Sequence, residues 1–288
     1  GRQATLESRR INVRVGIEMN RTPLGDITED QIGTYEEDGI VLLKGLFDMD
    51  WVERLRDLAE ADLADPGPKA MELDKSGGRF FFDTFMWTFN DGFRTAVFES
   101  PAAEITATMM RSAKTNIIFD QLLIKEPGTA ERTIWHHDIT YWPVDGNQVC
   151  TLWLALDEVT PDSGAVEYVK GSHKWGQRYK AEAFAGDGRY KEPLPEVPDI
   201  ETQRGELDIA QFEMAPGDCT VHHGLLVHGA PGNELSDRRR RAYVTRWAGD
   251  DAIYYPRPDI QPMIWAPDAA EGGPLDSKLW PVVWRQGA

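Results

Sequence analysis

Hydrophobic and polar positions near the start of the chain follow a helical period, interrupted by one short apolar run. Thr28 and Gln31 have the spacing of a capping box, which predicts a helix that ends just before the apolar run 40–43. That run is typical of a buried strand. Apolar residues then recur at helical spacing from 51 to 63, until the Pro-Gly-Pro turn at 66–68, so we expect a second helix there.

Beyond residue 79 the pattern changes to short apolar or alternating runs. Two helical stretches, 92–99 and 102–112, interrupt them. Runs of strand composition are 80–87, 116–125, 149–156, 165–169, 219–222 and 240–247. Turns rich in glycine and proline, such as 215–218, separate these runs. Many short strands between such turns indicate an all-β core.

The length of 288 residues suits one barrel or sandwich with additions, so we expect a single domain. Its parts are an N-terminal arm (1–25), a supporting region of helices and strands (26–114), the barrel core (115–250) and a C-terminal tail (251–288). Within the core, the stretch 176–212 is rich in glycine, proline and charge, and it is too long for an ordinary connection. Such an insertion is typical of a lid or substrate loop.

Composition and charge narrow the class of partner. The 31 basic and 48 acidic residues give a formal charge of −17, which disfavours binding to nucleic acid or to anionic lipid. Hydrophobic residues make up 41% of the chain, enough for a sizeable core, yet no apolar run is long enough to cross a membrane. Cys150 and Cys219 are not closely spaced, and no apolar run typical of a signal peptide precedes the folded part. We therefore expect a cytoplasmic protein.

The heptapeptide 135–141, Trp-His-His-Asp-Ile-Thr-Tyr, carries the strongest chemical signal. Alternate side chains of a strand point to opposite faces, so His136, Asp138 and Thr140 would share one face and His137 would lie on the other. A histidine and a carboxylate on one face form a metal-binding pair. We expect His137 to be a packed or hydrogen-bonded neighbour.

A third metal ligand must come from elsewhere, and the stretch 221–230 supplies the candidates His222, His223 and His228. Two histidines and one carboxylate leave the opposite positions of a metal open. Non-haem Fe(II) oxygenases use this arrangement. Oxygen chemistry is therefore the leading hypothesis.

Five features together resemble the phytanoyl-CoA dioxygenase family of Fe(II)- and 2-oxoglutarate-dependent oxygenases. They are the pair His136-x-Asp138, the run Gly164–His173, the turn Pro216-Gly217-Asp218, the segment Leu225–Gly229 and an arginine near Arg240. The likeness covers roughly residues 30–250. It implies a mainly β fold, a double-stranded β-helix (a jelly-roll or cupin-like barrel), with flanking N-terminal helices.

The same resemblance implies the chemistry and the ligand set. His228 matches the distal histidine of the family, so the metal ligands and catalytic centre would be His136, Asp138 and His228. The cofactors would be Fe(II), the cosubstrate 2-oxoglutarate and O2. The enzyme would be a dioxygenase that hydroxylates a small molecule and releases succinate and CO2. His173 matches a histidine of the family that does not bind the metal, and we expect it to be structural.

The basic run 238–241 continues into a strand, so only one parity can face the barrel interior. In the resembling family an arginine shortly after the distal histidine holds the far carboxylate of 2-oxoglutarate, a task that suits the planar guanidinium. We assign this role to Arg240, two residues before Ala242, with Arg239 as the alternative. Three further residues are candidate contacts of the cosubstrate: Trp153, Gln121 and Lys125.

We expect the substrate to be a small free molecule and not a CoA thioester. A carrier with several phosphates needs a local basic patch, and the dense one at 238–241 is committed to a strand. Candidate substrate contacts are Phe81, Trp87, Trp142 and Arg246. These side chains would suit a substrate with an apolar body and an anionic or polar handle.

Other classes of protein could use the same residues. A cupin-like binding protein could keep the metal without turnover, and a metal-dependent hydrolase or isomerase could use Zn²⁺ or Mn²⁺. Arg240 argues against a hydrolase, which does not need a carboxylate clamp beside an open metal face, and a pure binding protein does not need three vacant metal positions. A halogenase of this fold normally lacks the carboxylate ligand, whereas Asp138 is present.

Overall fold

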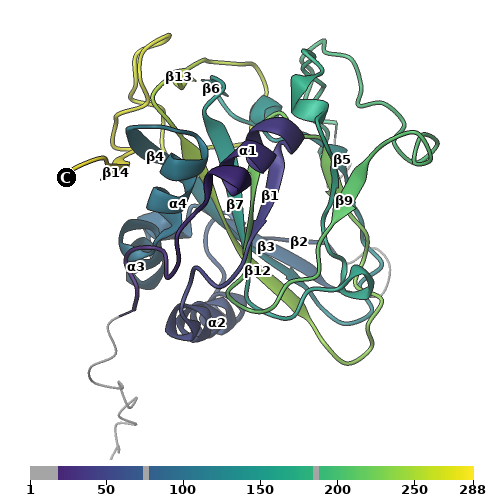
Figure 1. Cartoon of the computed structure of the whole chain (residues 1–288). Coiled ribbons are helices and arrows are strands. Elements are labelled where there is room, and N and C mark those ends of the chain that lie inside the picture. Colours follow the sequence, from purple (N-terminus) through teal and green to yellow (C-terminus); the bar gives the residue numbers. More distant parts are fainter. Residues whose placement is uncertain (1–18, 74–77, 184–187) are drawn as a thin grey trace, which may run out of the picture.

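The computed structural model of the chain describes residues 19–73, 78–183 and 188–288. Its helices are α1 (Glu29–Asp38), α2 (Met49–Ala64), α3 (Asp91–Glu99) and α4 (Ala102–Met109) (Figure 1). Thr28 and Gln31 form the predicted capping box of α1, and Gly39 ends this helix in the left-handed region at φ 78°. A Cβ atom on Gly39 would lie 2.4 Å from Nδ1 of His173. The turn therefore requires glycine both for its positive φ and for lack of space.

Eight strands form the larger sheet, in the order β1-β10-β7-β12-β4-β3-β2, with β14 paired to β4. The strands are β1 (Ile40–Leu43), β2 (Met71–Leu73), β3 (Phe80–Thr84), β4 (Lys114–Lys125), β7 (Val149–Ala155), β10 (Cys219–His223), β12 (Arg240–Ala248) and β14 (Val282–Arg285). Every pair is antiparallel. The sheet therefore has the topology expected for an antiparallel barrel, not for a parallel α/β fold.

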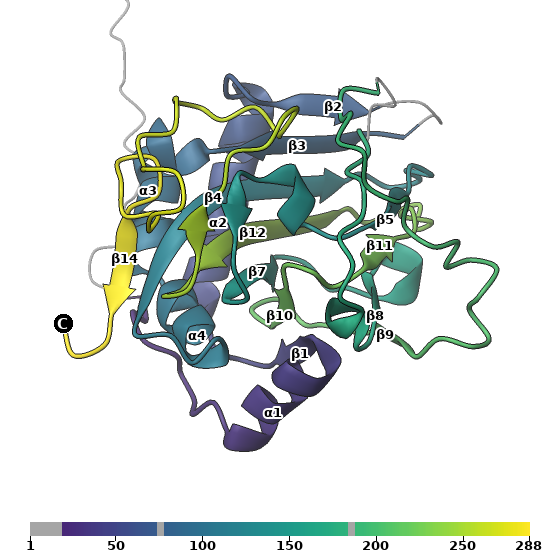
Figure 2. The ribbon, with the colours of Figure 1, turned by 90° about the horizontal axis from the view of Figure 1, so that it is seen from above.

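A second sheet of four strands has the order β5-β11-β8-β9 and lies away from α3 and α4 (Figure 2). Its strands are β5 (Thr133–His136), β8 (Glu167–Val169), β9 (Ile209–Gln211) and β11 (His228–Ala230). A two-stranded sheet joins β6 (Val144–Asp145) to β13 (Ile253–Tyr254). Short 3-10 turns complete the list: Met86–Thr88, Ile139–Tyr141, Pro161–Ser163 and Ser172–Lys174.

The main hydrophobic core lies between the four helices and the outer face of the larger sheet. Leu122 of β4, Leu152 of β7 and Tyr243 of β12 all contribute to it, together with Trp51 of α2 and Phe93 of α3. Side chains one position further along these strands point to the opposite, inner face. The functional site is built on that inner face.

Two predicted elements are shorter in the structure than the sequence suggested. The strand expected over 135–141 stops at His136, and Asp138 already has helical dihedral angles (φ −73°, ψ −38°). The aromatic run 80–87 is a strand only to Thr84 and then turns through Phe85, which has a positive φ of 63°. The predicted N-terminal arm lies mostly outside the described residues. Among those described, none of the helices combines the length and the apolar character that a membrane span requires.

Candidate functional site

The two histidines of the predicted triad are brought together by strand pairing. His136 is the last residue of β5 and His228 is the first residue of β11, and the two are direct partners in the antiparallel register. Their ring centroids lie 4.2 Å apart. The sheet therefore presents both rings at the same end and on the same face.

Asp138 completes the group because the chain turns immediately after β5. Its Oδ1 atom lies 3.5 Å from Nε2 of His136 and 3.7 Å from Nε2 of His228. One ligand atom from each of the three residues lies within 4.8 Å of the others, and all three side chains are buried. This spacing suits three ligands on one face of a single metal ion.

Backbone carbonyls orient the two histidine rings. Nδ1 of His136 lies 2.7 Å from the carbonyl oxygen of Ile134, and Nδ1 of His228 lies 2.9 Å from that of Leu226. A carbonyl oxygen only accepts, so Nδ1 must carry the proton in each ring. The lone pair of Nε2 is therefore directed at the metal position, as metal-binding histidines require.

The second oxygen of Asp138 accepts two hydrogen bonds. Thr151 of β7 donates to Oδ2 from its hydroxyl at 2.6 Å, and the imidazole Nε2 of His222 on β10 donates to the same atom at 3.2 Å. Both donors therefore hold Oδ2 away from the histidine pair. Oδ1 is left as the single oxygen that faces the metal position.

The electrostatic environment keeps this donor set in metal-binding form. Burial, reinforced by His136 and His222, lowers the pKa of His228 well below its ordinary value, so the ring is neutral. Burial opposes ionisation of Asp138, but the electrostatic effect of His228 and the hydrogen bond from His222 outweigh it and hold the pKa of that carboxyl well below its usual range. A neutral imidazole and an ionised carboxylate are the forms that bind metals.

The remaining histidines lie outside the triad. His137 is buried on the far side of the chain and accepts a hydrogen bond from the backbone N–H of Tyr179 at 3.1 Å, as predicted for a packed neighbour. His173 lies in a turn and contacts the backbone of Glu36. His223 faces away from the triad, toward Asn147.

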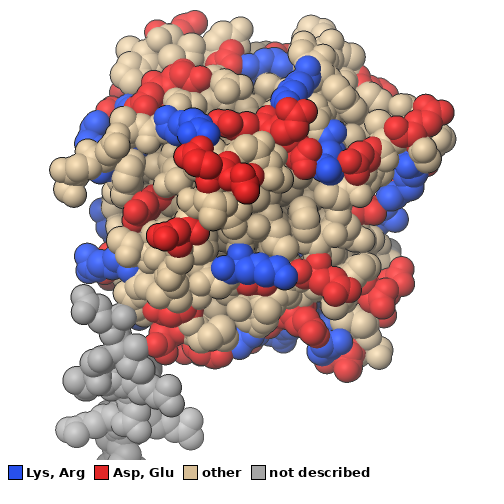
Figure 3. Space-filling model, in the orientation of Figure 1, with Lys and Arg blue, Asp and Glu red and all other residues tan. Residues whose placement is uncertain are grey.

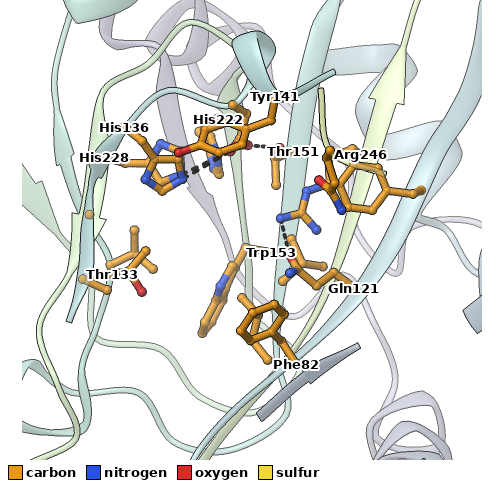
Figure 4. A pocket seen from close by; sticks show the side chains of 18 of the residues that line it. Phe82, Gln121, Thr133, His136, Tyr141, Thr151, Trp153, His222, His228 and Arg246 are labelled. Atoms are coloured by element: carbon orange, nitrogen blue, oxygen red, sulfur yellow. Dashed lines mark hydrogen bonds and ion pairs between the residues drawn. The ribbon is translucent and has the colours of Figure 1, made fainter. Parts of the chain in front are cut away.

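The triad opens into a cavity of about 100 Å³ on the inner face of the larger sheet (Figure 4). The side chains that surround it are mainly aromatic or aliphatic, with a few polar groups. They include Phe80, Phe82, Phe119, Gln121, Leu123, Tyr141, Trp142, Thr151, Trp153, His222, Val244, Arg240, Arg246 and Gln261. A largely apolar cavity with few convergent polar groups is the usual form of a small-molecule site.

Arg240 occupies this cavity, as the strand parity predicts. It is 2% exposed, its guanidinium lies 5.3 Å from the ring of Trp153, and it donates from Nη2 to the carbonyl of Gly164 at 3.0 Å. Its Nε atom has no hydrogen-bond partner within the described part of the chain. Arg239, by contrast, points outward and pairs with Glu60 and Glu126.

Four further predicted residues line the same cavity: Trp153, Gln121, Trp142 and Arg246. Three do not. Lys125 is fully buried, its Nζ donates to the carbonyl of Pro231 at 2.8 Å, and it is not among the residues that line the cavity. Phe81 and Trp87 pack in the core between the larger sheet and the helices.

The prediction that Phe81 lines the cavity was wrong by one position. Phe80 and Phe82 line the cavity because the side chains of β3 alternate, and Phe81 takes the helix side. Trp87 lies beyond the end of β3 in a 3-10 turn, where it packs against Phe98. The sequence could not separate these positions, because aromatic residues occur on both faces of this strand.

Some residues of the site were not predicted at all. Thr151 and Gln261 carry no sequence signal of their own. Thr151 is found only through its cross-strand partners His222 and Arg246, and Gln261 belongs to the C-terminal tail, which folds back over the cavity. Glu182 and Tyr190 lie in the described parts of the long stretch 176–212 and contact Tyr141 beside the triad, so these parts of the predicted loop pack over the site.

Comparison with known proteins identifies the family. A family model described as phytanoyl-CoA dioxygenase (PhyH) matches residues 35–242. The chain belongs to the phytanoyl-CoA dioxygenase family. A probable phytanoyl-CoA dioxygenase of Caenorhabditis elegans is 25% identical over 158 residues, which is 53% of this chain and 49% of that protein. The chain thus spans about half the length, or less, of the first curated relatives that it matches.

Solved structures share the fold of this phytanoyl-CoA dioxygenase family member. The non-haem alpha-ketoglutarate-dependent carbocyclase SnoK from nogalamycin biosynthesis is 22% identical with a TM-score of 0.74, and the match covers 92% of this chain and all of SnoK. The epimerase SnoN from the same biosynthesis is 21% identical with a TM-score of 0.71, covering 89% of this chain and 98% of SnoN. The predicted double-stranded β-helix is confirmed.

Proposed function

We propose that this protein is an Fe(II)- and 2-oxoglutarate-dependent dioxygenase that hydroxylates a small molecule and releases succinate and CO2. The observation that carries the proposal is one cavity that holds both a group of two histidines and one carboxylate and a buried arginine with a free donor. A metal with open positions needs the first feature. A dicarboxylate cosubstrate needs the second.

The side chains fit the implied groups. His136, Asp138 and His228 would hold Fe(II), which supplies the activation of O2 that amino-acid side chains cannot perform. Oδ1 of Asp138 would be the single carboxylate ligand, because Thr151 and His222 occupy Oδ2. Hydrogen bonds of this kind fix the orientation of a ligand and strengthen metal binding.

Arg240 would bind the far carboxylate of 2-oxoglutarate. Its guanidinium is buried and it makes no salt bridge within the described part of the chain, so an incoming carboxylate would supply the missing partner. Trp153 lies under the same guanidinium and would form an apolar wall for the cosubstrate carbons. The apolar lining of the cavity would exclude water from the reacting groups.

Paired substitutions on β12 test the assignment of Arg240. Arg240→Ala should raise the apparent KM for 2-oxoglutarate at least about tenfold while iron binding changes little, since losing a buried charge-assisted pair costs roughly 2–5 kcal/mol. Arg239→Ala, on the outer side of the protein, should behave like the unmodified protein. The register is off by one if Arg239→Ala reproduces the defect and Arg240→Ala does not.

We further propose that the substrate is a small free molecule and not an acyl-CoA thioester. The formal charge of −17 disfavours a ligand with several phosphates, and Arg238, Arg239 and Arg241 are paired with acidic side chains on the outer surface. Succinate formation should be stimulated by members of panels of free acids or amino-acid derivatives. A response confined to a matched panel of acyl-CoA esters would reject this proposal.

The reaction outcome is a separate question, because SnoK and SnoN are described as a carbocyclase and an epimerase. We propose hydroxylation. Mass spectrometry of the product should then show one oxygen atom added to the substrate. An isomer of unchanged mass or a product that has lost two hydrogen atoms would contradict it.

A further inference from the structure

A second buried arginine faces the cavity and has unused donors. Arg246 lies on the same face of β12, six residues further along, and is 8% exposed. Its Nη2 donates to Oε1 of Gln121 at 2.5 Å. Its Nε and Nη1 atoms have no hydrogen-bond partner among residues 19–73, 78–183 and 188–288. Leaving buried donors of a charged group unpaired is costly.

The charge of Arg246 also lacks a direct counterion. No carboxylate of the described residues lies within 4.0 Å of its nitrogen atoms. Asp120, one of the two carboxylates that attract it from further away, is already bonded to Tyr243 and to the backbone of Trp87. The other, Asp138, is assigned to the metal. A buried cation without a partner is a strong sign of an anionic ligand.

The position of Arg246 indicates where that ligand lies. Figure 4 shows the guanidinium and Gln121 on the opposite side of the cavity from His136 and His228. Phe119 lies under the guanidinium at 4.7 Å and supports it as a planar surface. A molecule held by Arg246 would therefore fill the space in front of the triad.

A second cavity continues from this point. It has a volume of about 250 Å³, and it shares Phe82, Gln121, Tyr141 and Gln261 with the first. Beyond Gln121 its walls are formed mainly by apolar groups, among them Pro68, Met71 and Pro262. A ligand with its anionic end at Arg246 thus has room for an apolar body that extends away from the metal.

On this basis we propose that Arg246, aimed by Gln121, binds a carboxylate of the substrate, and that the substrate is a free carboxylic acid with an apolar body. The inference rests on the proposed function, which assigns Arg240 to the far carboxylate of 2-oxoglutarate. Arg246 is then left for a different anion. Gln121 favours the substrate as its source, because this residue lies where the two cavities meet.

Calorimetric binding to the anaerobic protein loaded with Fe(II) and 2-oxoglutarate tests the proposal. The probes are phenylacetate, hydrocinnamate and hexanoate, each compared with its uncharged primary amide. At least one acid should bind about tenfold or more tightly than its amide, as expected for one buried charge-assisted contact. Arg246→Gln should remove this preference and leave the binding of 2-oxoglutarate unchanged. Arg239→Gln, on the outer surface, should keep the preference.

The outcomes separate this proposal from the one on which it rests. Failure of the unmodified protein to bind 2-oxoglutarate would overturn the proposed function. Normal binding of 2-oxoglutarate with no acid preferred over its amide would overturn the role of Arg246 alone. Loss of 2-oxoglutarate binding in Arg246→Gln would assign this arginine to the cosubstrate instead. If that variant does not fold, Gln121→Met provides the second test, and it should weaken the preference for the acid.

Discussion

Asp138 is the metal ligand whose geometry depends most on its neighbours. Two donors, Thr151 and His222, reach the same oxygen from the adjacent strands β7 and β10. Without them the carboxylate could rotate, because Asp138 lies in a turn and not in a strand. The larger sheet therefore sets the orientation of the Asp138 carboxylate, although Asp138 itself comes just after β5 of the smaller sheet.

Thr151→Val should weaken metal binding without removing a ligand. The substitution deletes the hydroxyl that donates to Oδ2 of Asp138, and losses of such supporting hydrogen bonds typically cost about 10- to 100-fold in metal affinity. Thr151→Ser keeps the hydroxyl and should bind nearly as well as the unmodified protein. Competition with a chelator, measured anaerobically with Fe(II), gives the affinities. Equal affinity of the Val and Ser variants would show that the hydroxyl does not matter.

The ligands themselves were within reach of sequence reasoning, whereas their supports were not. A His-x-Asp pair and a distal histidine are local patterns, so His136, Asp138 and His228 could be named from the residues and the resemblance together. In the sequence, His222 and His223 are equally plausible as the residue that supports the metal ligands. The pairing of His222 with Thr151 across β10 and β7 decides which of them faces the site.

At the scale of elements, strand parity predicted some faces correctly and failed on others. It held for β12, where Arg240 and Arg246 face the cavity and Arg241 faces outward. It succeeded there because β12 pairs with β4 in one continuous register from Arg240 to Arg246. It failed for Phe81, since three consecutive phenylalanines give no alternation to read. The turn at Asp138 was missed for a similar reason. Residues on both sides of it are buried, so no run of exposed polar residues marks the end of the strand.

Three buried carboxyl groups connect α2, β3 and β4 behind the cavity: Asp62, Asp83 and Asp120. Burial and the neighbouring Asp83 raise the pKa of Asp62 to about 7, and burial raises that of Asp120 to about 7. A folded-state pKa above the unfolded value means that the protonated form stabilises the fold. This contribution is complete below about pH 4 and is lost as the pH rises through 7.

Asp62→Asn should therefore stabilise the protein at high pH. The amide cannot ionise but still donates a hydrogen bond to Asp83, so the free energy of unfolding at pH 8 should rise by about 1–3 kcal/mol over the unmodified protein. At pH 4 the two should be similar. Denaturant titrations at both pH values measure the difference. Asp57→Asn, on the exposed side of the same helix, is the control, and a pH-independent effect of Asp62→Asn would refute the explanation.

At the scale of the whole molecule, the site lies between two sheets while the helices cover the opposite face of the larger one (Figures 1 and 2). This arrangement buries the metal ligands, and described residues of the stretch 176–212 and of the C-terminal tail border the two cavities. The sequence indicated that the first of these packs over the site. It gave no sign that Gln261 of the tail would reach the cavity.

Net charge describes the molecule only on average. On the face shown in Figure 3, acidic and basic side chains are interspersed, and the acidic ones are more numerous. Lys69 and Arg189 nevertheless lie beside the second cavity. The attraction of an anionic substrate would therefore be local, despite the charge of −17.

The single-domain division and the cytoplasmic location stay predictions.

Anaerobic titration of the Fe(II)-loaded protein with 2-oxoglutarate tests the central claim most directly. The account predicts a weak visible charge-transfer band that saturates with added 2-oxoglutarate. The band should be absent from His228→Ala, which lacks a metal ligand, and retained in His173→Ala, whose histidine lies outside the cavity. A protein that binds iron through the triad and yet develops no band at saturating 2-oxoglutarate would contradict the account.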